Sequence, residues 1–499
     1  MNLLTIENLS KVFTERQIFD HADFSVNEGE KIGVIGVNGT GKSTLLKIIA
    51  GLEEPDEGKV TLGNNLVLGY LPQKPEFEEG MTVLQAALAG NRNKINEWSI
   101  ESEAKTMLQS LGIDEFEKLV CHLSGGQKKR VALANVLLKE PDILILDEPT
   151  NHLDGQMAQW LEDFLIRFRG ALVMVTHDRY FLDRVATRIV EVDQGKIYSY
   201  PGSYSEFVRL KEERQNMEIA TERKRRSILR KELEWLMRGA RARSTKQKAH
   251  IQRIEAMQEK EGPQEEGQVQ MSSLSSRLGR KTVEVEGLSK AYGDHLLIRD
   301  FSYIFLKGDR VGITGCNGCG KSTLLKMIVG EVEPDAGSIE IGQTVKIGYF
   351  SQESESLDAY MRVIDYIKEA GEYVQTTDGT ITAAQMLERF LFDGTMQWSL
   401  IGKLSGGEKR RLYLLRILMT APNVLILDEP TNDLDIRTLT ILEDYLDGFD
   451  GIVIPVSHDR YFLDRLVRRM FAFEDNGKVS QNEGGFSASQ AASAAHMDD

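Results

Sequence analysis

The stretch GVNGTGKST, from Gly36 to Thr44, decides the fold of this chain, and GCNGCGKST, from Gly315 to Thr323, repeats it. Each stretch is followed by LSGGQ or LSGGE and then by LILDEPTN. The two glycine-rich stretches start 279 residues apart, and the two LILDEPTN stretches start 281 residues apart. Because these spacings are nearly equal, the chain contains an internal duplication, and we expect two matched copies of one domain.

The composition is that of an ordinary globular protein, with 499 residues of which 41% are hydrophobic and 27% charged. A chain of this length exceeds one hydrophobic core, which favours several domains. No window approaches the roughly 18 uninterrupted apolar residues of a membrane helix, and the start, MNLLTIENLSKVF, lacks a secretory signal. Three cysteines are too few for a disulfide framework. We therefore expect a cytoplasmic protein with no membrane contact.

Positive charge is concentrated in the middle of an otherwise acidic chain, whose net charge is −15. From Thr221 to Arg253, twelve lysines and arginines stand against three glutamates. Such asymmetry favours a polyanionic partner, and the alternative is a solvated helix surface.

The same basic segment carries a helical pattern. Leu229, Leu233 and Leu236 recur at helical spacing, and RGARARST, from Arg238 to Thr245, interrupts the pattern before it resumes. We predict a helical hairpin, whose first helix of about 30 residues would extend about 45 Å. The stretch from Gly262 to Arg280, rich in Gly, Gln, Ser and Glu, is predicted to be a flexible return.

Each copy alternates strand and helix patterns. In the first copy KIGVIG, DILILDEP and ALVMVTHD are apolar enough for buried strands, and STLLKIIAGL has a helical pattern. The fold class predicted is therefore α/β, with a mainly parallel sheet in each copy. About 50 residues from Gln73 to Ser124, and again from Gln352 to Ser405, predict a smaller helical subdomain. Pro455 lies inside the strand pattern IVIPVSHD, where it would remove a ladder hydrogen bond and misalign the second copy slightly.

The glycine-rich stretches follow a strand and open a helix, the context in which backbone N–H groups hold phosphates. The lysine supplies a cation to the β- and γ-phosphates, and the serine offers a hydroxyl to Mg²⁺. The residues expected to bind ATP are Gly36, Asn38, Gly39, Gly41, Lys42, Ser43 and Thr44 in the first copy and Gly315, Asn317, Gly318, Gly320, Lys321, Ser322 and Thr323 in the second.

Each LILDEP strand ends with two carboxylates at the edge of the sheet where α/β proteins bind ligands. The aspartate suits Mg²⁺, and the glutamate one residue later is placed to polarise the attacking water. The histidine of THDR or SHDR can hydrogen-bond the γ-phosphate. These residues are Asp147, Glu148 and His177 in the first copy and Asp428, Glu429 and His458 in the second.

The LSGGQ and LSGGE segments place small residues before a helix, whose amino terminus is an anion site. Each copy already has one such site for its own nucleotide, so this second site must serve the phosphate of the other copy. On these motifs, residues 1–200 and 282–475 resemble the ATP-binding-cassette superfamily, whose cassettes pair head to tail. The resemblance implies an intramolecular dimer of cassettes in a monomeric chain, with ATP and Mg²⁺ at two composite sites.

The resemblance also implies the members of each composite site. Site one would combine Lys42, Gln73, Asp147, Glu148 and His177 with Ser405, Gly406 and Gly407, and site two would combine Lys321, Gln352, Asp428, Glu429 and His458 with Ser124, Gly125 and Gly126.

Three further positions match the superfamily. The resemblance implies that the glutamine binds Mg²⁺ together with Ser43 or Ser322, that an aromatic residue stacks on adenine, and that an aspartate after LILDEPTN links the two sites. The matching residues are Gln73, Phe13 and Asp154 in the first copy and Gln352, Tyr292 and Asp435 in the second. Because both copies keep the full set, we predict that both sites hydrolyse ATP.

Tandem cassettes joined by a charged hairpin resemble the ABC-F group of translation factors, and EWLMRGARARSTKQKAHIQRIE, from Glu234 to Glu255, resembles the linker of its Uup-like branch. The resemblance implies an ATPase that binds the tRNA exit site of the 70S ribosome. Its linker would reach the P-site tRNA and rRNA and relieve stalled translation. The residues expected to contact RNA are Arg238, Arg241, Arg243, Lys246 and Lys248.

The expected domains are a first cassette, a basic linker with its flexible return, a second cassette and a disordered tail. Their expected ranges are 1–203, 204–281, 282–475 and 476–499.

Two alternative functions stay open. A basic hairpin also suits branched DNA in a recombination ATPase, and some ABC-F proteins protect ribosomes from antibiotics by extending the hairpin tip. The short RGARARST tip favours a housekeeping role. The ATPase subunit of a transporter would share the cassette motifs but would not need a basic hairpin.

Overall fold

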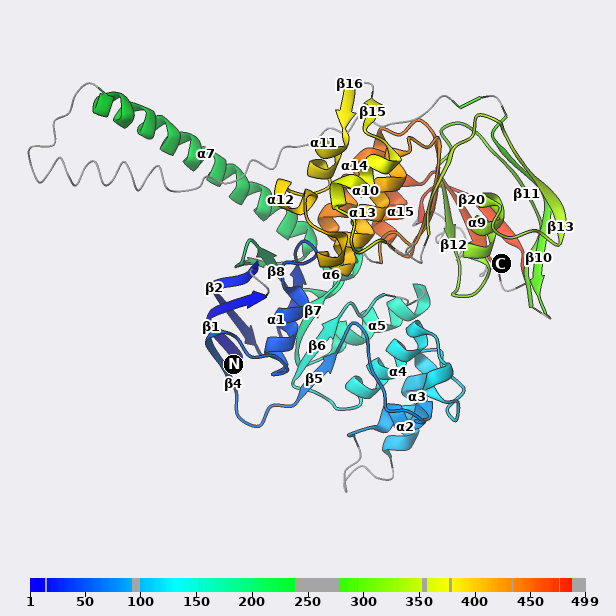
Figure 1. Ribbon diagram of the computed structural model, residues 1–499. Coiled ribbons are helices and arrows are strands. Elements are labelled where there is room, and N and C mark those ends of the chain that lie inside the picture. Colours follow the sequence, from blue (N-terminus) through cyan, green and yellow to red (C-terminus); the bar gives the residue numbers. More distant parts are fainter. Residues whose placement is uncertain are drawn as a thin grey trace, which may run out of the picture.

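The computed structural model describes residues 1–13, 16–91, 99–151, 153, 155–237, 278–279, 281–293, 295–351, 357–376, 379–432, 434–474 and 476–486. They form two similar halves and one long helix, α7 (Tyr204–Met237), which leaves the first half and projects away from both (Figure 1). Within these residues, no helix combines the length and the apolar content that crossing a bilayer requires.

The first half contains a three-stranded antiparallel sheet in the order β2-β1-β4 and a six-stranded, mainly parallel sheet in the order β5-β6-β7-β3-β8-β9. Its strands are β1 (Asn2–Phe13), β2 (Arg16–Asn27), β3 (Lys31–Ile35), β4 (Glu57–Leu62), β5 (Leu68–Leu71), β6 (Ile143–Asp147), β7 (Ala171–Val175), β8 (Arg188–Asp193) and β9 (Lys196–Pro201). Its helices are α1 (Lys42–Ile49), α2 (Val83–Leu88), α3 (Ile100–Ser110), α4 (Gly125–Leu137), α5 (Gly155–Arg167) and α6 (Arg179–Val185).

The second half repeats this arrangement, with sheets in the orders β11-β10-β13 and β14-β17-β18-β12-β19-β20. Its strands are β10 (Val283–Tyr292), β11 (His295–Phe305), β12 (Val311–Thr314), β13 (Ala336–Ile341), β14 (Ile347–Phe350), β17 (Val424–Asp428), β18 (Ile452–Val456), β19 (Arg469–Phe473) and β20 (Val479–Glu483). Its helices are α9 (Lys321–Val329), α10 (Val363–Ala370), α11 (Ala383–Arg389), α12 (Gly394–Gln397), α13 (Gly406–Met419), α14 (Ile436–Asp447) and α15 (Arg460–Leu466). The predicted α/β fold with two tandem copies is therefore confirmed.

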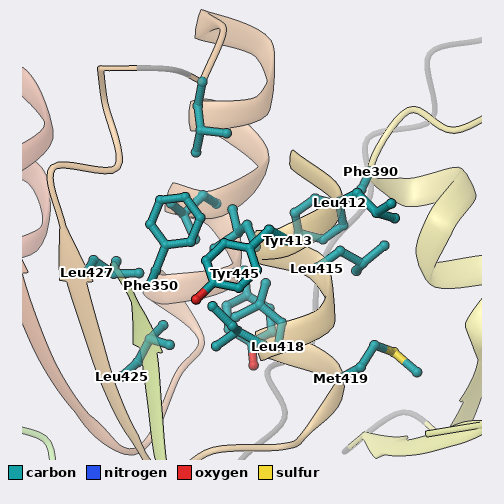
Figure 2. Packing of buried hydrophobic residues seen from close by; sticks show 14 of the residues in the cluster. Phe350, Phe390, Leu412, Tyr413, Leu415, Leu418, Met419, Leu425, Leu427 and Tyr445 are labelled. Atoms are coloured by element: carbon teal, nitrogen blue, oxygen red, sulfur yellow. The ribbon is translucent and has the colours of Figure 1, made fainter. Parts of the chain in front are cut away.

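Apolar side chains on both faces of the parallel sheets hold each half together, as expected for parallel strands. All five residues of β6 and of β17 are buried. In the second half, Phe350 and Leu427 from the sheet pack against Leu412 and Leu415 of α13 and Tyr445 of α14 (Figure 2). This core fixes the position of the strand ends, where the candidate site residues lie.

Pro455 weakens the second sheet, as its position in the sequence predicts. In the first half, β3 and β7 pair over Lys31–Val34 and Leu172–Val175. In the second half, β12 and β18 share only the Ile313–Val456 pair, supplemented by an isolated bridge from Arg310 to Val453. Proline has no N–H to donate, so the ladder is interrupted between the phosphate loop strand and the strand that leads to His458.

Two parts of the second half differ from the sequence prediction. The expectation of a disordered tail from residue 476 is wrong for its first part, because β20 pairs antiparallel with β19 and Phe486 is buried. The predicted helical subdomain also contains a hairpin of β15 (Tyr373–Thr376) and β16 (Gly379–Thr382). The polar sequence of β20, VSQNE, has little apolar patterning, because this edge strand has few side chains to bury.

Candidate functional site

The first phosphate loop connects β3 to α1 and depends on glycine at its turns. Gly41 caps α1 with a φ of 101°, and a Cβ there would lie 2.2 Å from Cγ2 of Ile18. A Cβ on Gly36 would lie 2.5 Å from the carbonyl oxygen of Val192. Side chains larger than hydrogen would therefore push the loop away from the sheet.

The loop lysines are buried in both halves and fold back over their loops. Lys42 Nζ donates to the carbonyl oxygen of Gly36 at 2.7 Å, and Lys321 Nζ donates to that of Gly315 at 2.7 Å. Burial lowers the pKa of Lys42, and the charge of Asp435 opposes this shift. A polyphosphate beside this ammonium would stabilise its charged form, which fits the residues to ATP.

A serine and an aspartate meet behind each loop. Burial raises the pKa of Asp147 and of Asp428, while hydrogen bonds from Ser43 and Ser322 oppose the shift. Among the described residues, Oδ1 of each aspartate is buried without a hydrogen-bond partner. Oxygen atoms of this kind are the ligands that Mg²⁺ takes, so the serine and aspartate of each half fit the metal.

The glutamate and the histidine lie close together in each half. Nε2 of His177 lies 3.2 Å from Oε1 of Glu148, and Nε2 of His458 lies 3.3 Å from Oε1 of Glu429. Burial raises the pKa of each glutamate to about 8 and lowers the pKa of each histidine to about 3. The histidines are thus neutral, and the second carboxylate oxygen of each glutamate, buried without a partner in the described part of the chain, is available to a water.

The structure brings the LSGGE segment of the second half onto the first phosphate loop. Ser405 caps α13 in a reciprocal capping box with Glu408. The next turn packs against the loop so closely that a Cβ on Gly407 would lie 2.1 Å from Nδ2 of Asn38. The backbone N–H of Asn38 also donates to Oδ2 of Asp435 at 3.1 Å. The segments predicted for site one therefore meet across the two halves.

Site two has a more open geometry. A cavity of about 870 Å³ lies between the halves, lined by Gly315 and Cys316 of the second phosphate loop, by His458, and by Asn151 and Leu153 of the first half. Ser124 caps α4 with the same capping box as its counterpart, with Gly125 and Gly126 in the turn that follows. The second phosphate loop therefore lines a cavity, whereas the first has Gly407 of the other half packed against it.

Other predicted residues fall into two groups. Phe13 and Tyr292 end β1 and β10, are 41% and 52% exposed, and each has a lysine Nζ 5.3 or 5.4 Å from its ring centre. Gln73 is exposed just after β5. The other group lies outside the described residues and comprises Gln352, Asp154, Arg238, Arg241, Arg243, Lys246 and Lys248.

Sequence reasoning missed the residues that join the halves away from the phosphate loops. Asn151 Nδ2 donates to the carbonyl oxygen of Asn432 at 3.0 Å. Arg179 pairs with Glu443 of the other half through two nitrogens, at 2.9 and 3.1 Å. Arg179 directly follows the sequence THD, which contains the predicted site residue His177. That position was the one indication in the sequence that Arg179 lies near an ATP site.

Sequence reasoning also missed the root of α7. Glu191 on β8 is buried and accepts from Lys211 at 2.5 Å and from Arg214 at 3.2 Å, both on α7. Tyr200 donates to the same carboxylate at 3.2 Å. The neighbouring residue, Val192, is the one whose carbonyl contacts the first phosphate loop at Gly36. The helix is therefore tied to the strand that supports site one.

Comparisons with known proteins agree with this geometry. A family model described as ABC transporter matches residues 19–151 and again 298–432, and a second model with the same description matches residues 190–272. The ranges of the first model contain both phosphate loops, and the range of the second contains α7.

Two curated relatives align with nearly the whole chain. The uncharacterized ABC transporter ATP-binding protein YfmR of Bacillus subtilis is 48% identical over 98% of this chain and 83% of its own length. The energy-dependent translational throttle protein EttA of Escherichia coli is 38% identical over 97% of this chain and 94% of its own length.

A solved structure has the same tandem fold. It contains an archaeal ribosome recycling factor, aABCE1, in complex with the ribosomal stalk protein aP1, and superposes with a TM-score of 0.66. The identity is 20%, and the match covers 98% of this chain and 92% of that one.

Proposed function

Because the chain belongs to the ABC-F family of ATP-binding cassette ATPases, we propose that it is a ribosome-associated translation factor that couples ATP hydrolysis to the position of its interdomain linker. The observation that carries the proposal is the direct tie between site one and α7 through Glu191 and Val192. The relationship to EttA, named for throttling translation, supports the ribosome as the partner.

In this proposal, the residues of site one divide the chemistry between the halves. Lys42 binds the phosphates, while Ser43 and Asp147 hold Mg²⁺, which would neutralise charge on the phosphates. Glu148, oriented by His177, positions the attacking water. The Gly407 turn of the other half completes the site, so ATP would bind most tightly when the halves are closed.

The proposal extends to where the protein binds. The cassettes would occupy the tRNA exit site, and the linker beyond α7 would contact the P-site tRNA and rRNA to relieve stalled translation. The 34-residue length of α7 supports this reach, since a helix rises about 1.5 Å per residue. Contacts between basic side chains and phosphates would be largely independent of sequence.

Cosedimentation with 70S ribosomes tests the proposal. The double variant Glu148→Gln with Glu429→Gln should bind ATP without hydrolysing it and pellet with ribosomes when ATP is present. A matched variant, Lys42→Ala with Lys321→Ala, loses the phosphate-binding ammonium groups and should stay in the supernatant. If the glutamine variant sedimented equally with and without ribosomes, the ribosomal role would be wrong.

A further inference from the structure

The contact between Arg179 and Glu443 is the most fully buried ion pair that joins the two halves of the described chain. Nη1 of Arg179 donates to Oε2 of Glu443, Nη2 lies 2.9 Å from Oε1, and the two side chains are 4% and 0% exposed. Arg465 of the second half donates to the same carboxylate at 2.6 Å, and the guanidinium of Arg179 also lies 5.0 Å from the ring centre of Tyr461. Glu443 is thus held by one arginine from each half.

The duplication supplies a second copy of this group. At a spacing of 281 residues, Arg179 corresponds to Arg460 and Glu443 corresponds to Glu162, while Arg465 corresponds to Arg184. Arg184 Nε lies 2.7 Å from Oε1 of Glu162, as expected from the first group.

In the second group, only some of the corresponding contacts are formed. Arg460 lies 4.8 Å from the ring centre of Tyr180, which mirrors Arg179 over Tyr461. Its Nη2, however, donates to Oε1 of Gln159 at 3.3 Å, and no ion pair of the described residues joins Arg460 to Glu162. Arg460, Gln159 and Glu162 all line the cavity at site two.

The state of each group matches the state of the ATP site beside it. Arg179 lies two residues after His177 of site one, where the Gly407 turn packs on the phosphate loop. Arg460 lies two residues after His458 of site two, whose phosphate loop lines the cavity at Gly315 and Cys316, while no described residue of the first phosphate loop lines it. The formed pair therefore accompanies the closed site, and the unformed pair accompanies the open one.

We propose that Arg179 and Arg460 are positioning residues, each of which closes one ATP site by pairing with a glutamate of the opposite half. Arg179 closes site one through Glu443, and Arg460 closes site two by moving from Gln159 to Glu162. Because each arginine starts the helix that follows the histidine loop, its pairing holds that histidine against the γ-phosphate. The inference rests on the composite sites of the proposed function and adds the groups that close them.

Steady-state ATP hydrolysis in single-site backgrounds tests the assignment of each arginine to one site. In the Glu148→Gln background, where site two alone is expected to turn over, Arg460→Met should lower kcat about tenfold, the effect of about 1.4 kcal/mol on the closed state. The KM for ATP should change less than about twofold. In the Glu429→Gln background the same substitution should have little effect, and Arg179→Met should show the converse pattern.

Arg209→Met removes an exposed arginine of α7, paired at 2.9 Å with Glu213, and should change neither background. Equal losses in both backgrounds for Arg179→Met and Arg460→Met would indicate a merely structural role and overturn the proposal. Unchanged kcat for Arg460→Met in the Glu148→Gln background would also overturn it.

A charge exchange in the otherwise natural chain tests the second pair without relying on the site assignments. Arg460→Glu should lower kcat, and adding Glu162→Arg together with Arg184→Glu, which keeps the charge pairing at residues 162 and 184, should recover at least about half of the loss, since the charges at residues 460 and 162 again attract. If the losses of kcat caused by the separate substitutions simply added in the combined variant, the proposed pairing of Arg460 with Glu162 would be wrong. If instead the exchange rescued turnover while Glu148→Gln and Glu429→Gln left hydrolysis unchanged, the arginine pairing would stand and the catalytic assignment would fall.

Discussion

Glu148 and Glu429 each adopt a left-handed backbone conformation, with φ of 52° and 50°. Such a conformation costs a residue with a side chain on the order of 1–3 kcal/mol and persists where the surroundings enforce it. The backbone N–H of Glu148 donates to the carbonyl oxygen of Val175 on β7, and that of Glu429 donates to the carbonyl oxygen of Val456 on β18. The strain aims the carboxylate at the histidine, and its presence in both halves supports hydrolysis at both sites.

Removing both carboxylates should stop turnover without removing ATP. In Glu148→Gln with Glu429→Gln, the amides keep the shape but cannot accept a proton from water, so we expect kcat to fall at least about 100-fold. Filter binding should still detect retained ATP. Hydrolysis within about threefold of the natural chain would contradict the assignment of these glutamates.

The same two glutamates should make stability depend on pH. In the unfolded chain they titrate near the ordinary pKa of 4.5, whereas burial raises their pKa to about 8 in the folded chain. The folded state therefore binds more protons between these values, and its stability falls as the pH rises toward about 8. His177 and His458, with a pKa lowered to about 3 from 6.5, oppose this trend only at pH values below about 6.5.

Thermal unfolding without nucleotide checks this expectation. The Tm should fall between about pH 6.5 and about pH 8. The double glutamine variant should show a smaller fall, since glutamine does not titrate. Identical slopes for the two proteins would mean that other groups cause the pH dependence.

At the scale of the elements, the root of α7 distinguishes the two copies. Glu191 on β8 corresponds to Ala472 on β19, and within the described residues the long helix α7 follows the first half. The carboxylate is therefore a feature of the linker attachment and not of the ATP chemistry that the copies share.

Glu191→Ala should loosen this attachment. It leaves Lys211 and Arg214 without their buried partner, and we expect the free energy of unfolding of the first half to fall by about 2 kcal/mol. The measurement is the Tm of the first calorimetric transition, together with faster tryptic cleavage within α7. Glu213→Ala removes only an exposed pair with Arg209 and should cost less than about 1 kcal/mol. Equal shifts for the two variants would contradict the role of Glu191.

Some elements of the structure could be predicted from the sequence, and others could not. The phosphate loops, the buried strands and the capped helices follow from local patterns, so they could be found from the motifs. The contact of Gly407 with Asn38 could be expected only from the family resemblance, because no local pattern describes how two halves dock. The Arg179–Glu443 pair depends on the same docking, and β20 depends on the neighbouring strand β19.

At the scale of the whole molecule, an acidic chain with a net charge of −15 contains one strongly basic segment, from Thr221 to Arg253. Ribosome binding in the ATP-bound state should then weaken with salt, with log K falling linearly against log salt concentration. Replacing Arg238, Arg241 and Arg243 with alanine should reduce the slope by about 0.7–0.9 per lost phosphate contact. Arg167→Ala, at an exposed position on α5, should leave the slope unchanged. An unaltered slope in the triple variant would place the RNA contacts elsewhere.

The attachment of α7 also sets a mechanical scale for the protein. The helix is 34 residues long, or about 51 Å, and its base is clamped to the strand beside the first phosphate loop. A tilt of about 5° at that base would sweep the far end through about 4 Å. Under the proposed function, the helix would act as a lever arm that converts a sub-ångström adjustment around a phosphate into a displacement the size of a side chain.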